Sequence, residues 1–68
     1  MKISARSVLK GKIVDIKKGA TTAHVLLDVN GTTITASITN ESVDDLKLTV
    51  GQSAYAVIKS PDVMIGID

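Results

Sequence analysis

The chain has 68 residues, a formal net charge of +1, one histidine and no cysteine, phenylalanine or tryptophan. A chain of this length forms one small domain over residues 1–68, and the lack of cysteine excludes both disulfides and a cysteine-based zinc site as supports for its core. Of the usual supports for small domains only association with other copies is left, so we expect an obligate homo-oligomer.

Alternating apolar and polar residues predict that most of the chain forms β-strands. Five strands are expected, near residues 7–17, 22–29, 32–39, 53–59 and 63–67. The breaks between them carry turn residues, at Lys18–Thr21, Asn30-Gly31, Thr49–Gln52 and Ser60–Asp62. Asn30-Gly31 is the strongest hairpin signal, because a type I′ turn needs a positive φ at both central positions.

Residues 40–46 break the alternation and are acidic in their first turn. They follow Thr39, which is an acceptable N-cap, so we expect a short helix here. Five short strands with one small helix between the third and the fourth are typical of an all-β, OB-like barrel. Closure of such a barrel would leave no exposed strand edge.

Two segments near the ends of the chain each combine a cation with a hydroxyl group, namely Ser4-Ala5-Arg6 and Lys59-Ser60. Thr39 and Ser42 add two more hydroxyls, at the expected start of the helix. Taken singly, each has a structural explanation, because Thr39 can cap its own helix and both cations can be ordinary surface charges. Together they offer hydrogen-bond donors without a carboxylate acceptor, which suits a small, fully deprotonated dianion such as molybdate or sulfate.

Two other places offer donors for an anion. Ser60 precedes Pro61, an arrangement favoured at the start of a helical turn with Ser60 as its cap. The turn Gly19-Ala20-Thr21-Thr22 offers successive backbone N–H groups, which would form an anion-binding nest if several copies met there at a symmetry axis. An ordinary hairpin turn is the more common use of such a sequence.

No catalytic or metal-ligating set accompanies these residues. His24 lies in the middle of a predicted strand without a second metal ligand nearby, and no nucleophile has a general base. We therefore expect a binding protein and not an enzyme, with no site for a bare metal cation. The N-terminus has no apolar leader and no stretch approaches membrane-spanning length, so we expect a cytoplasmic protein without membrane contact.

Three ordered motifs together resemble a known family, and they lie at residues 4–11, 38–43 and 56–64. The chain resembles the molbindins, free-standing Mop domains that bind molybdate or tungstate, and the likeness covers essentially all 68 residues. It implies one Mop domain over residues 1–68 with a five-stranded OB-like barrel. It also implies a hexamer, built as a trimer of dimers, that holds the oxyanion between subunits without an organic cofactor.

The resemblance implies how the ligand is shared between subunits. Ser4, Arg6 and the main chain around Ala5 would come from one subunit, whereas its partner would supply Thr39, Ser42, Lys59 and Ser60. A second class of sites, near the threefold axis, corresponds to the turn formed by Gly19, Ala20, Thr21 and Thr22.

At two positions the chain departs from the family pattern. Ser7 stands where the family usually has asparagine, which puts any role of that amide in question. Lys47 replaces a common glycine where the helix ends. A left-handed cap at Lys47 would be strained by about 1 kcal/mol.

The resulting hypothesis is a protein of the molybdenum pool that binds molybdate or tungstate reversibly, for storage or homeostasis. One alternative is an OB-type nucleic-acid-binding module, which the single aromatic residue Tyr55 and the low net charge disfavour. Another is a structural or regulatory module that binds sulfate or phosphate incidentally.

Overall fold

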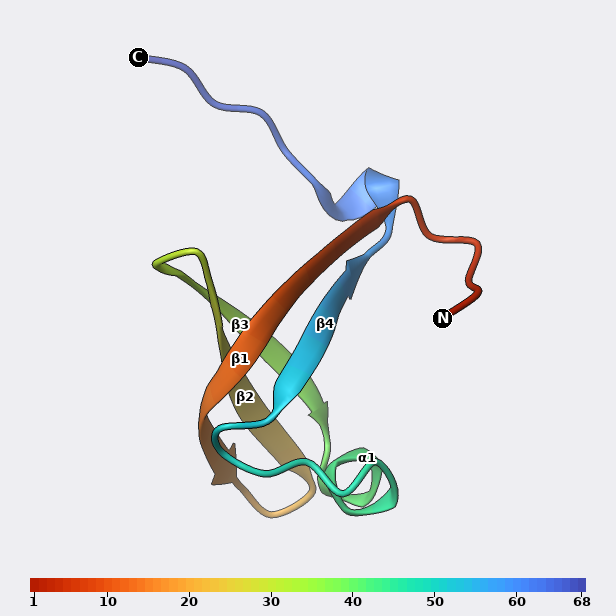
Figure 1. Cartoon of the computed structure of the whole chain (residues 1–68), viewed down its shortest axis with the longest axis vertical. Helices are drawn as coiled ribbons and strands as arrows, with labels where there is room; N and C mark the ends of the chain where they lie inside the picture. The colour runs from red at the N-terminus through yellow and green to blue at the C-terminus, as the bar shows by residue number, and fades with distance from the viewer.

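The computed structural model describes all residues from Met1 to Asp68. In chain order its elements are β1 (Ser7–Lys18), β2 (Thr22–Val29), β3 (Thr32–Thr39), α1 (Asn40–Asp45), β4 (Ser53–Ile58) and the 3-10 turn η1 (Ser60–Asp62) (Figure 1). Each of these strands agrees with its sequence prediction to within one residue at either end. The predicted hairpin turn is also confirmed, because Asn30 and Gly31 have φ values of 51° and 89°.

The four strands form one antiparallel sheet in the order β3-β2-β1-β4. β1 changes partner along its length, since residues 7–12 pair with β4 and residues 12–18 pair with β2. A register shift between Ile13 and Asp15 leaves Val14 as an extra residue in β1. Such a bulge increases the local bend of a strand, and Figure 1 shows β1 curving between its two partners.

Gly11 lies where β1 passes from one partner to the other. A Cβ atom at this position would lie 2.4 Å from the carbonyl oxygen of Asp28 in β2 and 2.9 Å from Cγ2 of Val29. Real Cβ atoms do not approach backbone oxygen this closely, so glycine is required here for steric reasons.

The hydrophobic core lies inside the curl of the sheet and contains five buried residues, which are Ile13, Ala23, Val25, Leu27 and Val43. Four come from β1 and β2, and Val43 comes from α1, which closes one end of the core. A core of this size supplies little hydrophobic stabilisation, because many large apolar side chains of the chain remain exposed.

α1 begins and ends with recognisable caps. Thr39 is its N-cap, as predicted, and its Oγ1 accepts a hydrogen bond of 3.0 Å from the backbone N–H of Ser42. At the other end Leu48 N–H donates to Val43 O and Lys47 N–H donates to Asp44 O, both at 3.1 Å, which is a Schellman motif. Lys47 has a φ of 53°, so the left-handed cap expected at this residue is present.

No helix in the structure has the length and apolarity needed to cross a membrane.

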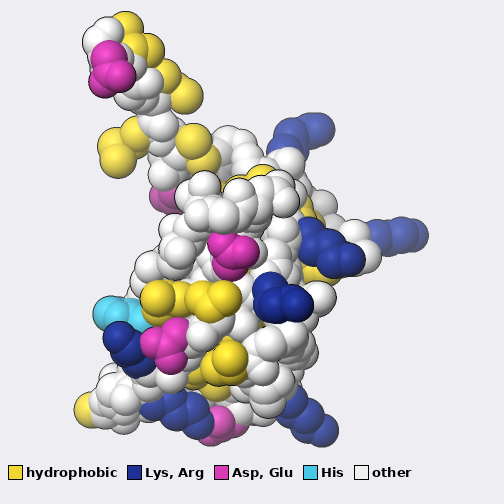
Figure 2. Space-filling model, turned by 60° about the vertical axis from the view of Figure 1, so that its left-hand side comes forward, with side chains coloured by type: hydrophobic (Ala, Val, Ile, Leu, Met, Phe, Trp, Pro, Cys, Tyr) yellow, Lys and Arg dark blue, Asp and Glu magenta, His cyan; other side chains and the backbone are white.

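The prediction of a closed five-stranded barrel is wrong for the single chain. The expected fifth strand, near residues 63–67, is extended but pairs with no other strand, so the sheet is open and β3 and β4 are its edges. Figures 1 and 2 show this C-terminal segment standing away from the body of the molecule beyond η1. The alternation of Val63, Ile65 and Ile67 favours a strand locally, but a strand also needs a neighbour, which this chain does not supply to it.

Candidate functional site

The two cation–hydroxyl segments lie at the same end of the sheet. Ser7 at the start of β1 pairs with Ile58 at the end of β4. Ser4-Ala5-Arg6 therefore leads into β1 beside the place where Lys59-Ser60 leaves β4. The structure thus brings both segments together within one chain, although they are separated by most of the sequence.

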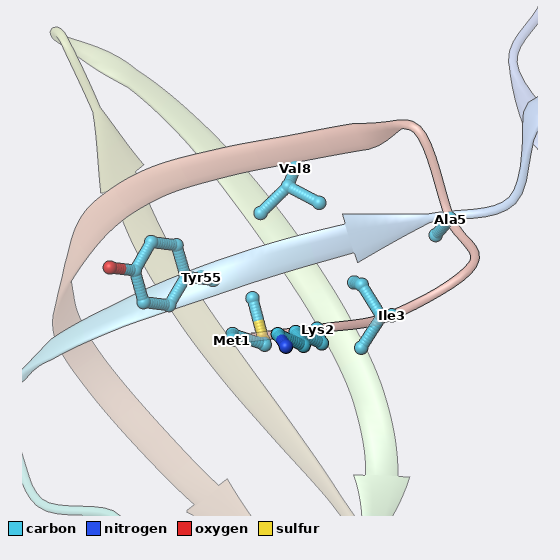
Figure 3. A pocket seen from close by; sticks show the side chains of 6 residues that line it. All are labelled: Met1, Lys2, Ile3, Ala5, Val8 and Tyr55. Atoms are coloured by element: carbon cyan, nitrogen blue, oxygen red, sulfur yellow. The ribbon is translucent and has the colours of Figure 1, made fainter.

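The apolar residues of the segment before β1 face a hollow on the surface of the sheet. Figure 3 shows Ile3 and Ala5 near a hollow that is also bounded by Val8 of β1 and Tyr55 of β4. This hollow has a volume of about 480 Å³. Ser4 and Arg6 do not line it and are exposed to solvent. The hydroxyl group of Ser4 and the guanidinium group of Arg6 are therefore accessible to a ligand.

Arg6 and Lys59 have no carboxylate partner. The two ion pairs of the chain, which join Lys17 to Asp15 and Lys18 to Asp44, use neither of them. Their two positive charges are therefore uncompensated at this end of the sheet, and an anion would meet no competing carboxylate within ion-pair distance of either cation.

The predicted role of Ser60 as a cap is wrong. The N-cap of η1 is Lys59, and Ser60 is the first residue inside the turn, followed by Pro61. No side chain caps η1, because a 3-10 turn of three residues leaves only a few backbone groups unpaired. The hydroxyl of Ser60 makes no hydrogen bond within the chain and stays free as a donor.

Thr39 and Ser42 lie at the other end of the molecule, where Thr39 ends β3 opposite Thr22. Thr39 Oγ1–H donates to Ser42 Oγ at 2.8 Å, in addition to the capping bond that Thr39 Oγ1 accepts. This contact consumes one of the two hydroxyl hydrogens. The pair therefore keeps one O–H donor for a ligand, that of Ser42.

Asn40 joins the helix to the predicted second anion site. Its backbone N–H donates to Thr21 O at 2.8 Å, and its Nδ2 donates to Gly19 O at 2.9 Å. Within the turn, Gly19 N–H donates to Thr22 O at 2.8 Å. The backbone N–H groups of Ala20 and Thr21 have no partner in the chain and remain available. Sequence reasoning gave Asn40 no role; the available signal was an amide side chain next to the cap, where it can bond to neighbouring backbone.

The candidate residues thus form two groups at opposite ends of β1. One contains Ser4, Ala5, Arg6, Lys59 and Ser60, and the other contains Thr39, Ser42 and the turn at residues 19–22. The 12 residues of β1 separate the groups. An oxyanion that contacts Thr39 as well as Lys59 must therefore take these residues from different copies of the chain.

Comparisons with known proteins identify the family. Residues 3–65 match the TOBE domain. Over 66 residues the chain is 52% identical to molybdenum-pterin-binding protein 1 of Clostridium pasteurianum, covering 96% of this chain and 97% of that protein. The chain belongs to the molbindin family.

Two solved structures resemble this molbindin closely. MopII from Clostridium pasteurianum is 48% identical, with a TM-score of 0.91, and the match covers 97% of this chain and 100% of that one. The cytoplasmic molybdate-binding protein ModG, with molybdate bound, is 42% identical with a TM-score of 0.92. That match covers all of this chain and 49% of ModG. The molbindin chain therefore has a mostly β, OB-like fold with one short helix.

Proposed function

We propose that this chain binds molybdate, or tungstate, reversibly in the cytoplasm and serves molybdenum storage or homeostasis without catalysing a reaction. The observation that carries the proposal is the register of β1 and β4, which brings Arg6 and Lys59 to the same end of the sheet without a carboxylate partner. The names of the relatives, and the ModG structure with molybdate bound, support the choice of oxyanion.

The donor set has the chemistry that molybdate requires. Molybdate is fully deprotonated near neutral pH, so its oxygens only accept hydrogen bonds. Arg6 and Lys59 would offset its charge, and Ser4, Ser60 and the main chain around Ala5 would donate to its oxygens. No carboxylate forms an ion pair with either cation, which favours such an ion over protonated phosphate.

The full site in this proposal lies between copies of the chain. The 68 residues act as one Mop domain in a homo-oligomer, and we retain the hexamer, a trimer of dimers, as the expected assembly. In this proposal Thr39 and Ser42 come from a different copy from Lys59 and Ser60, because the two pairs lie at opposite ends of one chain. This changes the division that the resemblance implies, in which one partner subunit supplies all four residues. The turn at Gly19–Thr22, with the free N–H groups of Ala20 and Thr21, is the second oxyanion site of the proposal.

Removal of either cation should weaken molybdate binding. Arg6→Ala and Lys59→Ala should each lower the affinity by about 10- to 100-fold, because a hydrogen bond to a charged group contributes about 1.5–3 kcal/mol. Isothermal titration of molybdate into each variant measures this. Lys10→Ala is the matched control, since Lys10 is also exposed and in no ion pair. Unchanged affinity in both test variants would refute the site.

The main alternative is incidental binding of sulfate or phosphate by a structural or regulatory module. Titration of molybdate in the presence of excess sulfate separates the two functions. A molybdate-binding protein keeps most of its affinity under this competition, whereas an unselective anion site loses it.

A nucleic-acid-binding module receives little support. Tyr55 is the only aromatic residue available for base stacking. On the face shown in Figure 2, acidic side chains lie beside several of the lysines and arginines, so charges of both signs are mixed there. We expect no mobility shift with single-stranded oligonucleotides.

A further inference from the structure

The turn between β1 and β2 is tied to the start of α1, and Figure 1 shows the two side by side at one end of the sheet. Asn40, the first residue of α1, makes two of the ties. Its backbone N–H donates to Thr21 O at 2.8 Å, and its side-chain Nδ2 donates to Gly19 O at 2.9 Å. The side-chain bond differs from the other, because it holds a carbonyl group inside the turn that carries the free N–H donors.

The bond to Gly19 O determines where the next N–H group points. Gly19 C=O and Ala20 N–H belong to one planar peptide unit, and the chain has no cis peptide bond. In a trans unit these two groups point in opposite directions. Since Gly19 O faces the Asn40 amide, Ala20 N–H faces away from it, and it has no partner in the chain. The side chain of Asn40 therefore sets the direction of this free donor.

No other hydrogen bond of the chain holds this peptide unit. Glycine has few steric limits on its backbone, so the unit that follows Gly19 rotates at small cost. Rotation by half a turn would put Gly19 O where Ala20 N–H now lies, and a carbonyl oxygen cannot donate to an oxyanion. The Asn40 amide is not reversible, because its Oδ1, which is buried and has no partner, would then meet Gly19 O as a second acceptor.

We propose that Asn40 is a positioning residue for the second oxyanion site, and that its side-chain amide makes the turn a donor site by holding the Gly19–Ala20 peptide in one orientation. The inference rests on the proposed function, because the second site is part of it. It goes further by assigning the preference of the turn for an anion to a residue outside the turn. In this role Asn40 acts through the peptide unit and makes no contact with the ion.

The orientation of the peptide is tested first without a ligand. Asn40→Ala removes the amide but keeps the backbone bond to Thr21 O and the N-cap Thr39. In NMR spectra of the ligand-free protein we expect the scalar coupling between the amide and α protons of Ala20 to change, because it depends on φ, and the Ala20 amide signal to move or broaden. An unchanged Ala20 coupling would overturn the proposal, whether or not the protein binds molybdate.

Two further variants separate the amide from a general loss of contact between the turn and α1. Asp44→Asn breaks the ion pair of 2.5 Å with Lys18 and leaves Asn40 in place, so the Ala20 coupling should stay the same. Asn40→Asp keeps the shape of the side chain, but its carboxylate has no donor and repels Gly19 O. This variant keeps the proposal testable if Asn40→Ala does not fold, and its change in coupling should be at least as large. An equal change in Asp44→Asn would overturn the proposal.

Isothermal titration of molybdate then measures the consequence for binding. The unmodified protein should show two classes of site; a single class would contradict the second site of the proposed function, and the Ala20 coupling would still test the peptide orientation. In Asn40→Ala the class that uses the turn should weaken by at least about 10-fold, because every turn that contacts the ion loses its fixed donor. The other class should stay within about twofold. Equal weakening of both classes would show that Asn40 only stabilises the fold, and would overturn the proposal.

Discussion

Lys47 holds the left-handed conformation that ends α1, with a φ of 53°. The two hydrogen bonds of the Schellman motif require this conformation, because they turn the backbone so that Leu48 N–H reaches Val43 O. Leu48 also packs against the core that contains Val43. A side chain with a Cβ atom at this position is strained, and the helix end keeps its geometry because the surrounding bonds and contacts determine it.

Substitution of Lys47 should therefore stabilise the protein. Lys47→Gly relieves the steric clash of Cβ in the left-handed region, and we expect the free energy of unfolding to rise by about 1 kcal/mol. Urea unfolding followed by circular dichroism measures the change. Lys47→Ala keeps the Cβ atom and is the matched control. A gain of the same size in Lys47→Ala would show that loss of the long charged side chain, and not relief of backbone strain, is the cause.

At the scale of the elements, agreement between sequence and structure depends on where the determining contacts lie. The strands of the sheet, the hairpin turn at Asn30-Gly31 and the N-cap Thr39 have signals within a few residues, and the structure confirms them. The segment at 63–67 has the same kind of local pattern, but its strand depends on a partner that the chain does not provide. Alternation predicts that a segment can be a strand, and it does not predict what that strand pairs with.

The candidate site also has one part that the sequence predicts and another that depends on contacts between distant residues. Donor residue types and their order along the chain are readable from the sequence. The proximity of Arg6 to Lys59 depends on the long-range register of β1 and β4, and the link through Asn40 depends on how the turn packs against α1. No single-sequence pattern encodes these two contacts, since each joins residues far apart in the chain.

The start of α1 gives a prediction at this scale. Thr39→Ala removes the oxygen that accepts the N–H of Ser42, so we expect the free energy of unfolding to fall by about 1 kcal/mol. Thr39→Ser keeps the hydroxyl and should stay within a few tenths of a kcal/mol of the unmodified protein. Denaturant unfolding of both variants without molybdate checks this. Equal losses in the two variants would assign the effect to the lost methyl group and not to the cap.

For the whole molecule, the balance of buried and exposed apolar surface is unfavourable in a single copy. Only five residues are buried, whereas many large apolar side chains, among them Met64, Ile65 and Ile67, are exposed to water. A domain of this size without disulfides or metal needs the stabilisation that association brings. We therefore expect folding of one chain and its association with other copies to be coupled in one equilibrium.

The thermal stability should accordingly depend on protein concentration. Association stabilises the folded state by mass action, so a hundredfold increase in concentration should raise Tm by roughly 10 °C or more. Calorimetry or circular dichroism over this concentration range, without molybdate, is the measurement. A Tm that stays constant would mean that a folded monomer unfolds on its own. Addition of molybdate then gives a separate shift, which reports ligand binding to the folded state.

The missing side chain of Gly11 has a consequence for strand alignment. The space beside Asp28 O accepts a hydrogen atom but not a Cβ atom, and both neighbours of Gly11 are lysines. If β1 slipped by one residue along β2, Lys10 or Lys12 would enter that space and its Cβ would collide with the backbone. Because only glycine fits at this position, both neighbouring registers of β1 against β2 are excluded. The remaining register determines which face of β1 turns toward the core.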